Sequence, residues 1–300
     1  MSKAAFKKQA LTYQQQLQQL IDRGLHVPDK ESLLHLLEVK SYYRLSGYWY
    51  PLLADKERHI FKKGTSFETA YKIYCFDREL RHFVLAELEK IEVAIRAKLI
   101  YIFSHCHGPF WYLDKELFKD ERKHKLIIEK LEKEYERSDE EFILAFRKKY
   151  SEPMPPSWML LEVTSFGTLS VMYYNLKSGH EKRRIAEAFG LSTRVFSSWI
   201  HCLVYLRNIC AHHARLWNRE MSIQPMIPHK TTFPWLNNKT INNKRFYFML
   251  SILVYMMNRI KYENDVVERF KGLLAKYPNI DPAAMGFPRG WENEPFWNGK

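Results

Sequence analysis

The chain has 300 residues, enough for one large domain or two modest ones with a buried core. Hydrophobic residues make up 46% of it and charged residues 27%, a composition that excludes a disordered, collagen-like or low-complexity protein. The formal net charge is +13, and such an excess favours an anionic partner, either nucleic acid or an anionic membrane.

Cysteine usage and hydropathy favour a cytoplasmic protein. Cys75, Cys106, Cys202 and Cys210 include no CxxC pair, so we expect four reduced thiols and no disulfide. The N-terminal residues have no apolar stretch typical of a signal peptide. The most apolar run, residues 246–257, is 12 residues long, fewer than the roughly 18 that a membrane span requires.

The hydrophobic periodicity predicts helices along almost the whole chain. Between Ser66 and His105 apolar residues recur at helical spacing without proline or glycine, which predicts one long helix, capped by Ser66, or two that meet at a kink. Only residues 48–61 favour a hairpin. Further helices are predicted over residues 114–137, from a capping box at 138–141 to 150, over 158–176 with an interruption near Gly167, and over 181–189, 193–216, 242–262 and 264–277.

These elements predict an all-α protein, a helical bundle with an N-terminal helical extension and an irregular C-terminal tail. We divide the chain into an N-terminal helical region (1–65), a main helical domain (66–262) and a C-terminal helix with the tail (263–300).

The segment with the strongest candidates for catalytic residues is RNICAHH, residues 207–213, late in a helix that Ser192 is expected to cap. Cleavage of a phosphodiester without a metal needs a base, an acid and fixed positive charge against the developing phosphorane. Histidine titrates near neutrality and can serve as acid or base, and arginine offers a planar fork of donors. Arg207, Asn208 and His212 are therefore candidate catalytic residues.

The spacing of these residues allows two interpretations. Asn208 and His212 are four apart and share a helix face, whereas Arg207 and His212 lie about 140° from each other on an ideal helix. Either the helix distorts here or two copies of the motif meet across a dimer. A purely structural histidine pair beside a surface arginine has equal weight on spacing alone.

The motif resembles the Arg-Asn-x-x-x-His motif of HEPN-domain ribonucleases, and its surroundings resemble the abortive-infection (Abi-like) proteins of bacterial phage defence. The similar segments are YYRLSGYW (42–49), FDRELR (76–81), IEVAIR (91–96), WMLLEVTSFG (158–167) and RNICAHHARLWNR (207–219). They occur in order from about Leu20 to Ile260. The resemblance implies a HEPN-like bundle that acts as a homodimer, and in this group some toxins are restrained by partner proteins or small RNAs.

The resemblance also assigns roles to the residues. His212 corresponds to the acid/base, Arg207 to the phosphate-stabilising cation, and Asn208 to a residue that orients the phosphate or the histidine. Glu92 and Arg96 correspond to polar residues on an earlier helix that face the motif, although their spacing equally fits a plain ion pair.

Three further residues support the motif. His213 points about 100° away from His212 on an ideal helix, so it either supports the site or bonds a backbone carbonyl. Arg215 and Arg219 are candidates for RNA phosphate contacts, with solvated surface charge as the alternative.

The sequence gives no sign of a cofactor or metal site. There is no phosphate-binding glycine loop and no paired metal carboxylates, and His105, Cys106 and His107 are neighbours that cannot all ligate one zinc ion. For the aromatic segment 42–49 we favour core packing over base stacking.

The predicted function is a metal-independent endoribonuclease of a bacterial abortive-infection system, which cleaves RNA by attack of the 2′-hydroxyl and has an antitoxin-like regulator. The alternatives are a non-catalytic protein that binds a small regulatory RNA, and a protein-interaction scaffold.

Overall fold

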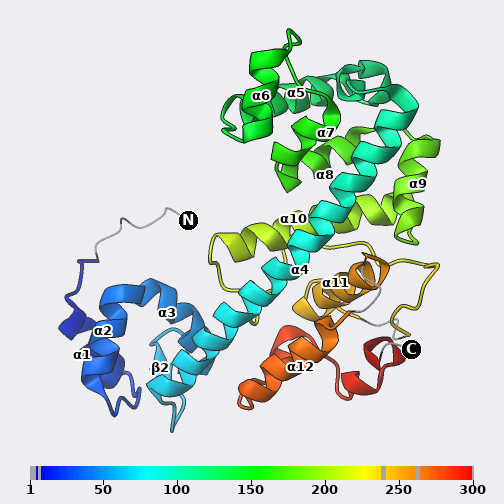
Figure 1. Cartoon of the computed structure of the whole chain (residues 1–300). Helices are drawn as coiled ribbons and strands as arrows, with labels where there is room; N and C mark the ends of the chain where they lie inside the picture. The colour runs from blue at the N-terminus through cyan, green and yellow to red at the C-terminus, as the bar shows by residue number, and fades with distance from the viewer. Residues whose placement is uncertain (1–4, 6–7, 238–240, 261–263, 299–300) are drawn as a thin grey trace. The chain divides into compact units, whose positions relative to one another are not determined.

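The computed structural model describes residues 5, 8–237, 241–260 and 264–298, and it is mostly helical (Figure 1). The prediction of an all-α protein is confirmed, since the sheet in the described residues has only two short strands. The chain forms two compact units. Unit 1 comprises residues 1–80 and 276–280, and unit 2 comprises residues 81–275 and 281–300. The predicted division at residues 65 and 262 stays a prediction.

Unit 1 consists of small helices, a short hairpin and the first turns of α4. Its elements are α1 (Tyr13–Asp22), α2 (Lys30–Lys40), α3 (Tyr42–Trp49), the 3₁₀ turn η1 (Tyr50–Leu52), β1 (Leu53–Asp55), β2 (Ile60–Phe61) and the beginning of α4 (Phe67–His107). The antiparallel pairing of β1 with β2 confirms the predicted hairpin. The buried Tyr48 hydroxyl of α3 donates to Asp77 of α4 at 2.6 Å, which fixes α3 against the core of the unit.

The long apolar segment forms one continuous helix, α4, of 41 residues. Ser66 caps it as predicted, because its Oγ accepts from the Thr69 amide at 3.3 Å. The helix ends at His107, and Gly108 follows it with a φ of 82°, the left-handed conformation that glycine adopts without steric cost.

Unit 2 contains the remaining helices. They are α5 (Glu121–Glu136), α6 (Glu141–Lys149), α7 (Ser157–Leu160), α8 (Phe166–Asn175), α9 (His180–Ala188), α10 (Thr193–Ala211), α11 (Phe246–Ile260) and α12 (Val266–Lys276, whose last residue belongs to unit 1), with the 3₁₀ turns η2 (Trp111–Leu113), η3 (Lys115–Leu117), η4 (Leu161–Val163), η5 (Pro282–Met285), η6 (Trp291–Asn293) and η7 (Pro295–Asn298). The predicted helix end at Tyr262 lies outside the described residues.

Two predicted helix starts are wrong. Asp114 caps only the turn η3, and α5 begins after Asp120, whose carboxylate accepts from the Lys123 amide at 3.0 Å. The capping box expected at Ser138 does not form, because the N-cap of α6 is Glu140 and no side chain caps it. In both places two acidic or hydroxyl residues compete for one cap, and the sequence does not rank them.

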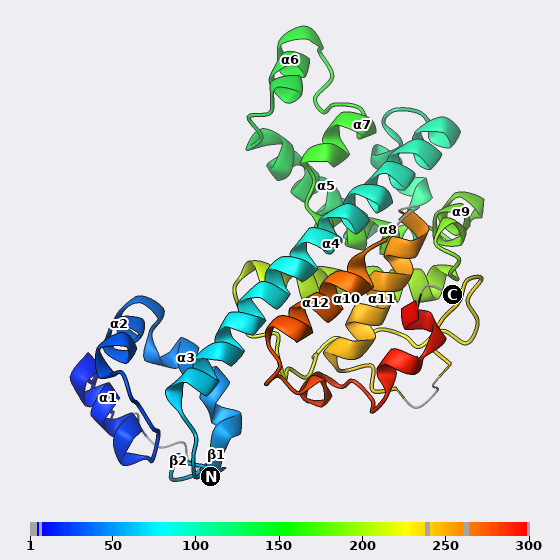
Figure 2. The same ribbon diagram turned by 60° about the horizontal axis from the view of Figure 1, so that its bottom comes forward.

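The most apolar run forms the buried helix α11, which lies beside α12 in unit 2 (Figure 2). The rings of Phe246 and Phe270 join these helices at 6.2 Å. The tail expected to be irregular contains short 3₁₀ turns, and the indole nitrogen of its buried Trp297 donates to the Tyr247 hydroxyl at 3.0 Å. Its aromatic content therefore serves the core of unit 2.

Among the residues that the structure describes, none of the helices combines the length and the apolar character that crossing a membrane requires.

A buried lysine binds backbone carbonyl oxygens at the end of α8. Lys182 of α9 is 6% exposed, and its Nζ donates to the carbonyl oxygens of Leu176 and Tyr174 at 2.8 and 3.1 Å. Burial, together with the nearby charge of Lys119, lowers the pKa of Lys182 from 10.5 to about 8. The protonated amine is thus held in place at a desolvation cost.

This pKa difference makes stability depend on pH. Between pH 8 and 10.5 the unfolded chain binds a proton at Lys182 that the folded protein has released, so raising the pH through this window favours the folded state. Urea unfolding of wild type and Lys182→Met should show the wild type gaining stability relative to the variant over this range. The exposed Lys125 supplies the control, since Lys125→Met removes one charge without a buried site. Parallel pH profiles for wild type and Lys182→Met would contradict the assignment.

Candidate functional site

The candidate site lies at the C-terminal end of α10. Ser192 caps the start of this helix as predicted, with its Oγ accepting from the Val195 amide at 3.3 Å. The helix is held by a buried apolar face that includes Trp199, Leu203 and Leu206 and reaches Cys210. Packing of this face fixes the direction in which the last turn presents its polar residues.

The end of α10 differs from the prediction and takes an unusual form. The helix was expected to reach Leu216 and ends at Ala211, with His212 as C-cap. The amides of His213 and Ala214 donate to the carbonyl oxygens of Cys210 and Ile209 at 3.0 and 2.9 Å, which is the pattern of a Schellman motif. The left-handed position of that motif, usually glycine, is His213, with φ of 56°.

The three candidate catalytic residues all lie on the surface of unit 2. Arg207, Asn208 and His212 are exposed, and Arg207 Nη1 donates to Asn208 Oδ1 at 3.4 Å. The backbone amide of His212 donates to the Asn208 carbonyl oxygen at 3.0 Å. A histidine buried in the apolar core could not contact RNA, whereas His212 is exposed and accessible to a ligand.

Glu92 of α4 lies close to this cluster. Burial raises the pKa of the Glu92 carboxyl, while the positive charges of Arg96 and Arg207 lower it without cancelling the effect of burial. The effect of Arg207 on this pKa indicates that Glu92 of α4 and Arg207 of α10 lie near each other, while a role for Glu92 in the site stays a prediction. A half-buried carboxylate next to Arg207 can orient its guanidinium.

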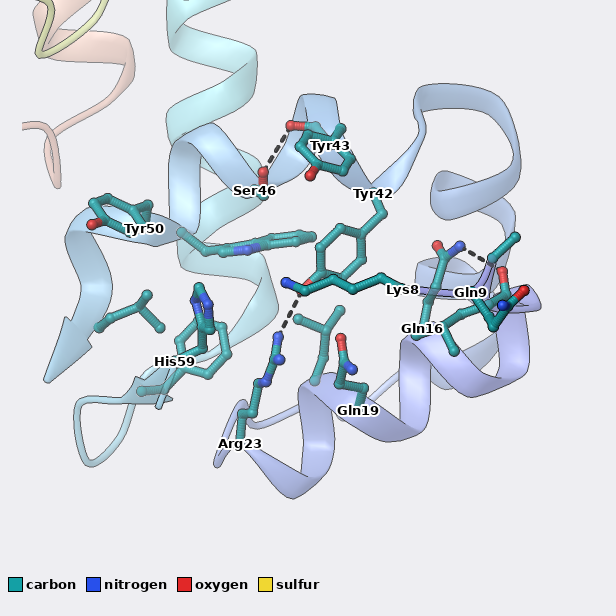
Figure 3. Close-up of a pocket in the computed structure, with 16 residues that line it drawn as sticks. Lys8, Gln9, Gln16, Gln19, Arg23, Tyr42, Tyr43, Ser46, Tyr50 and His59 are labelled. Carbon is teal, nitrogen blue, oxygen red and sulfur yellow. Dashed lines mark hydrogen bonds between the residues drawn. The ribbon is translucent and has the colours of Figure 1, made fainter. Parts of the chain in front are cut away.

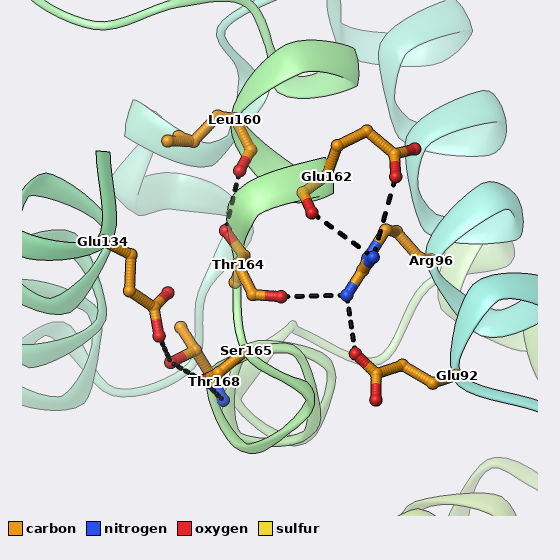
Figure 4. A network of polar contacts seen from close by, with 8 residues as sticks. All are labelled: Glu92, Arg96, Glu134, Leu160, Glu162, Thr164, Ser165 and Thr168. Carbon is orange, nitrogen blue, oxygen red and sulfur yellow. Dashed lines mark hydrogen bonds and ion pairs between the residues drawn. The ribbon is translucent and has the colours of Figure 1, made fainter. Parts of the chain in front are cut away.

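Arg96 is engaged within the protein. Its guanidinium donates to Glu92 at 2.6 Å, to the Thr164 carbonyl oxygen at 2.9 Å and to the Glu162 carbonyl oxygen at 3.4 Å (Figure 4). It also pairs with the Glu162 carboxylate at 3.6 Å, and its side chain is only 11% exposed. These contacts clamp the segment after α7 to α4, so they favour a positioning role for Arg96.

The same network continues to α5. Thr168 Oγ1 donates to the buried Glu134 carboxylate at 3.1 Å, and the Thr168 amide donates to Ser165 Oγ at 3.3 Å, which caps α8 (Figure 4). The polar chain thus fixes the start of α8, the helix on which α10 packs.

Arg215 and Arg219 follow the helix end and are half-buried. Arg219 Nη1 donates to the Arg215 carbonyl oxygen at 3.2 Å, and its Nε is buried and finds no acceptor among the described residues. Burial acts to raise the pKa of Tyr205, but hydrogen bonds with Ser222 and Arg219 lower it. Arg219 therefore contacts α10, and a fully solvated position is not observed for either arginine.

Tyr205 is the neighbouring residue that sequence reasoning missed. Its hydroxyl donates to Ser222 Oγ at 3.3 Å and thereby ties the loop after Arg219 to α10. The two residues are 17 apart in the chain, and no local pattern relates them.

The described part of the chain brings no three His, Cys, Asp or Glu side chains together in a group suited to a metal ion. In the segment 105–107, His105 Nδ1 lies 2.7 Å from the Tyr101 carbonyl oxygen of its own helix.

Comparison with known families gives one result. The model of the family described as Abi-like protein matches residues 35–218. This range contains the aromatic segment 42–49, Glu92, Arg96 and the motif from Arg207 to Arg215, and it ends one residue before Arg219. No curated protein and no solved structure shows a significant match to the chain.

The conformation of His213 yields a stability prediction. A residue with a Cβ in the left-handed region costs about 1 kcal/mol or more relative to glycine. His213→Gly should therefore be more stable than His213→Ala by about 1 kcal/mol, measured as the difference between their urea unfolding free energies. The alanine variant is the matched control because both substitutions remove the imidazole. Equal stability of the two variants would show that residue 213 does not adopt this conformation.

Proposed function

Because the chain belongs to the Abi-like protein family, we propose that it acts in bacterial abortive infection, in the cytoplasm, as a metal-independent endoribonuclease of the HEPN type. The observation that carries the proposal is the exposed cluster of Arg207, Asn208 and His212 at the end of α10, with Glu92 beside it. The net charge of +13 supports an RNA substrate, because Lys and Arg side chains neutralise phosphates.

In the proposed mechanism the 2′-hydroxyl of the substrate attacks the adjacent phosphate. His212 either accepts the proton of the 2′-hydroxyl as the base or donates a proton to the leaving 5′-oxygen as the acid. Arg207 stabilises the charge that develops on the phosphorane, and Asn208, bonded to Arg207, orients the guanidinium. The products are a 2′,3′-cyclic phosphate and a 5′-hydroxyl. A single strand suits this reaction, since in-line attack requires a flexible backbone.

The proposed enzyme is a homodimer with a composite site. One histidine at the end of α10 supplies either the acid or the base, whereas the reaction uses both. Arg207 lies inside the helix and His212 is its C-cap, so the two side chains leave α10 at different turns. A second subunit related by a two-fold axis brings a second histidine and a second arginine to the same phosphate.

Removal of the imidazole tests catalysis. In buffer with EDTA the wild type should cleave single-stranded RNA, and His212→Ala should be slower by about 10²- to 10⁴-fold, the usual contribution of a general acid or base. His201→Ala is the matched control, because His201 is an exposed histidine of the same helix. Circular dichroism checks that each variant folds. If wild type and His212→Ala retain RNA in a salt-sensitive manner and both leave it intact, the protein is a non-catalytic RNA-binding protein.

Mixing wild type with an inactive variant tests the composite site. Equal amounts of wild-type and His212→Ala subunits are unfolded together and refolded, so that half of the dimers are mixed. If each phosphate needs the histidines of both subunits, only the wild-type dimers cleave RNA, and the activity should fall to about a quarter of that of the same total amount of wild type. Sites built within one subunit would leave about half of the activity. Each protein refolded alone is the control.

A further inference from the structure

A cavity of about 530 Å³ lies within unit 1, between α1, α3 and the β-hairpin (Figure 3). This volume falls in the range of small-molecule sites, which is roughly 300–1,000 Å³. All the residues that line it lie between positions 8 and 61, and none of the residues of the described chain that line it is aspartate or glutamate. The basic side chains among these described lining residues are Lys8, Arg23 and His59, so the cavity suits an anion.

Aromatic side chains form one side of this cavity. We call Tyr42, Tyr43, Trp49 and Tyr50 the aromatic wall. Trp49 is buried and its ring meets Tyr42 edge-on at 5.2 Å, whereas Tyr50 is 46% exposed and Tyr43 is 88% exposed. Core packing, expected for the whole segment, thus accounts for Trp49 but not for Tyr43, whose side chain is mostly exposed. An exposed ring beside a cavity offers a stacking surface to a planar ligand.

Cationic side chains approach the same space from α1 and from the segment before it. Arg23 follows the last residue of α1, and its Nη1 donates to the Tyr42 hydroxyl at 2.9 Å, so the guanidinium is oriented toward the aromatic wall. Lys8 extends across the cavity toward Tyr42 (Figure 3). An arginine held in this way presents further N–H donors that match phosphate oxygens.

We propose that the cavity is a nucleotide-binding site, in which a base stacks on the aromatic wall while Arg23 and Lys8 bind its phosphate. This chemistry is offered by a free nucleotide and by an unpaired nucleotide of an RNA chain. The site lies entirely in unit 1 and shares no residue with the end of α10, so it does not depend on the proposed ribonuclease activity.

Binding is measured with the full-length chain carrying His212→Ala, so that RNA cleavage cannot disturb the titration. Isothermal titration with AMP, GMP, CMP and UMP should show one site per chain, and Tyr43→Ala should weaken binding by about 5- to 150-fold, the loss expected for one stacking ring. Tyr43 is almost fully exposed, so this substitution should not affect folding. Tyr101→Ala, at a tyrosine that is 59% exposed in unit 2, is the matched control and should bind as the parent does.

Two further arms identify the source and the role of the phosphate. Adenosine without phosphate should bind more weakly than AMP, and Arg23→Gln should abolish that difference. A short single-stranded RNA titrated beside the mononucleotides shows whether a nucleotide within a chain is the preferred form, again judged by sensitivity to Tyr43→Ala. The proposal is overturned if neither mononucleotides nor the RNA lose more affinity with Tyr43→Ala and Arg23→Gln than with Tyr101→Ala.

Discussion

The left-handed turn that closes α10 is the constraint on which the candidate site depends. An apolar face holds the helix in unit 2 up to Cys210, and the chain then has to leave the core at once. The turn at His213 satisfies two backbone carbonyl oxygens of the last helical turn and leaves His212 on the surface. Glycine would adopt this conformation with less strain, so the histidine introduces backbone strain that the packing of the helix offsets.

The two charged residues of α4 near the motif have different tasks, although they lie only four residues apart. The Arg96 guanidinium donates to acceptors on three residues and its side chain is only 11% exposed, so it stabilises the segment after α7 and does not face solvent freely. Glu92 receives one bond from Arg96 and lies within the electrostatic influence of Arg207. The clamp thereby positions the carboxylate, which lies near enough to the motif arginine for the charge of Arg207 to lower its pKa.

The sequence predicted two helix caps correctly because each cap depends on a local interaction. Ser66 and Ser192 were recognised as caps because a cap needs only a side chain and an amide three residues on. The end of α10 was missed because Leu216 and Trp217 are buried and continue the apolar pattern, while no glycine marks the turn at His213. The sequence did not predict the cavity of unit 1, because Gln16, Arg23 and Trp49 come together only when α1, α3 and the hairpin pack.

Asp77 and Glu92 both belong to α4, but Asp77 lies in unit 1 and Glu92 in unit 2, and the two carboxylates have different roles. In unit 1, Asp77 is fully buried and accepts from the Tyr48 hydroxyl, so it fixes α3 and with it the aromatic wall. In unit 2, Glu92 is only half-buried, and it stands beside the motif arginine. Burial and the bond from Tyr48 make Asp77 a structural group, whereas partial exposure beside a cation makes Glu92 a group that ligand binding can perturb. The cavity in unit 1 holds no carboxylate of its own among its described lining residues, so an anion bound there meets only attraction.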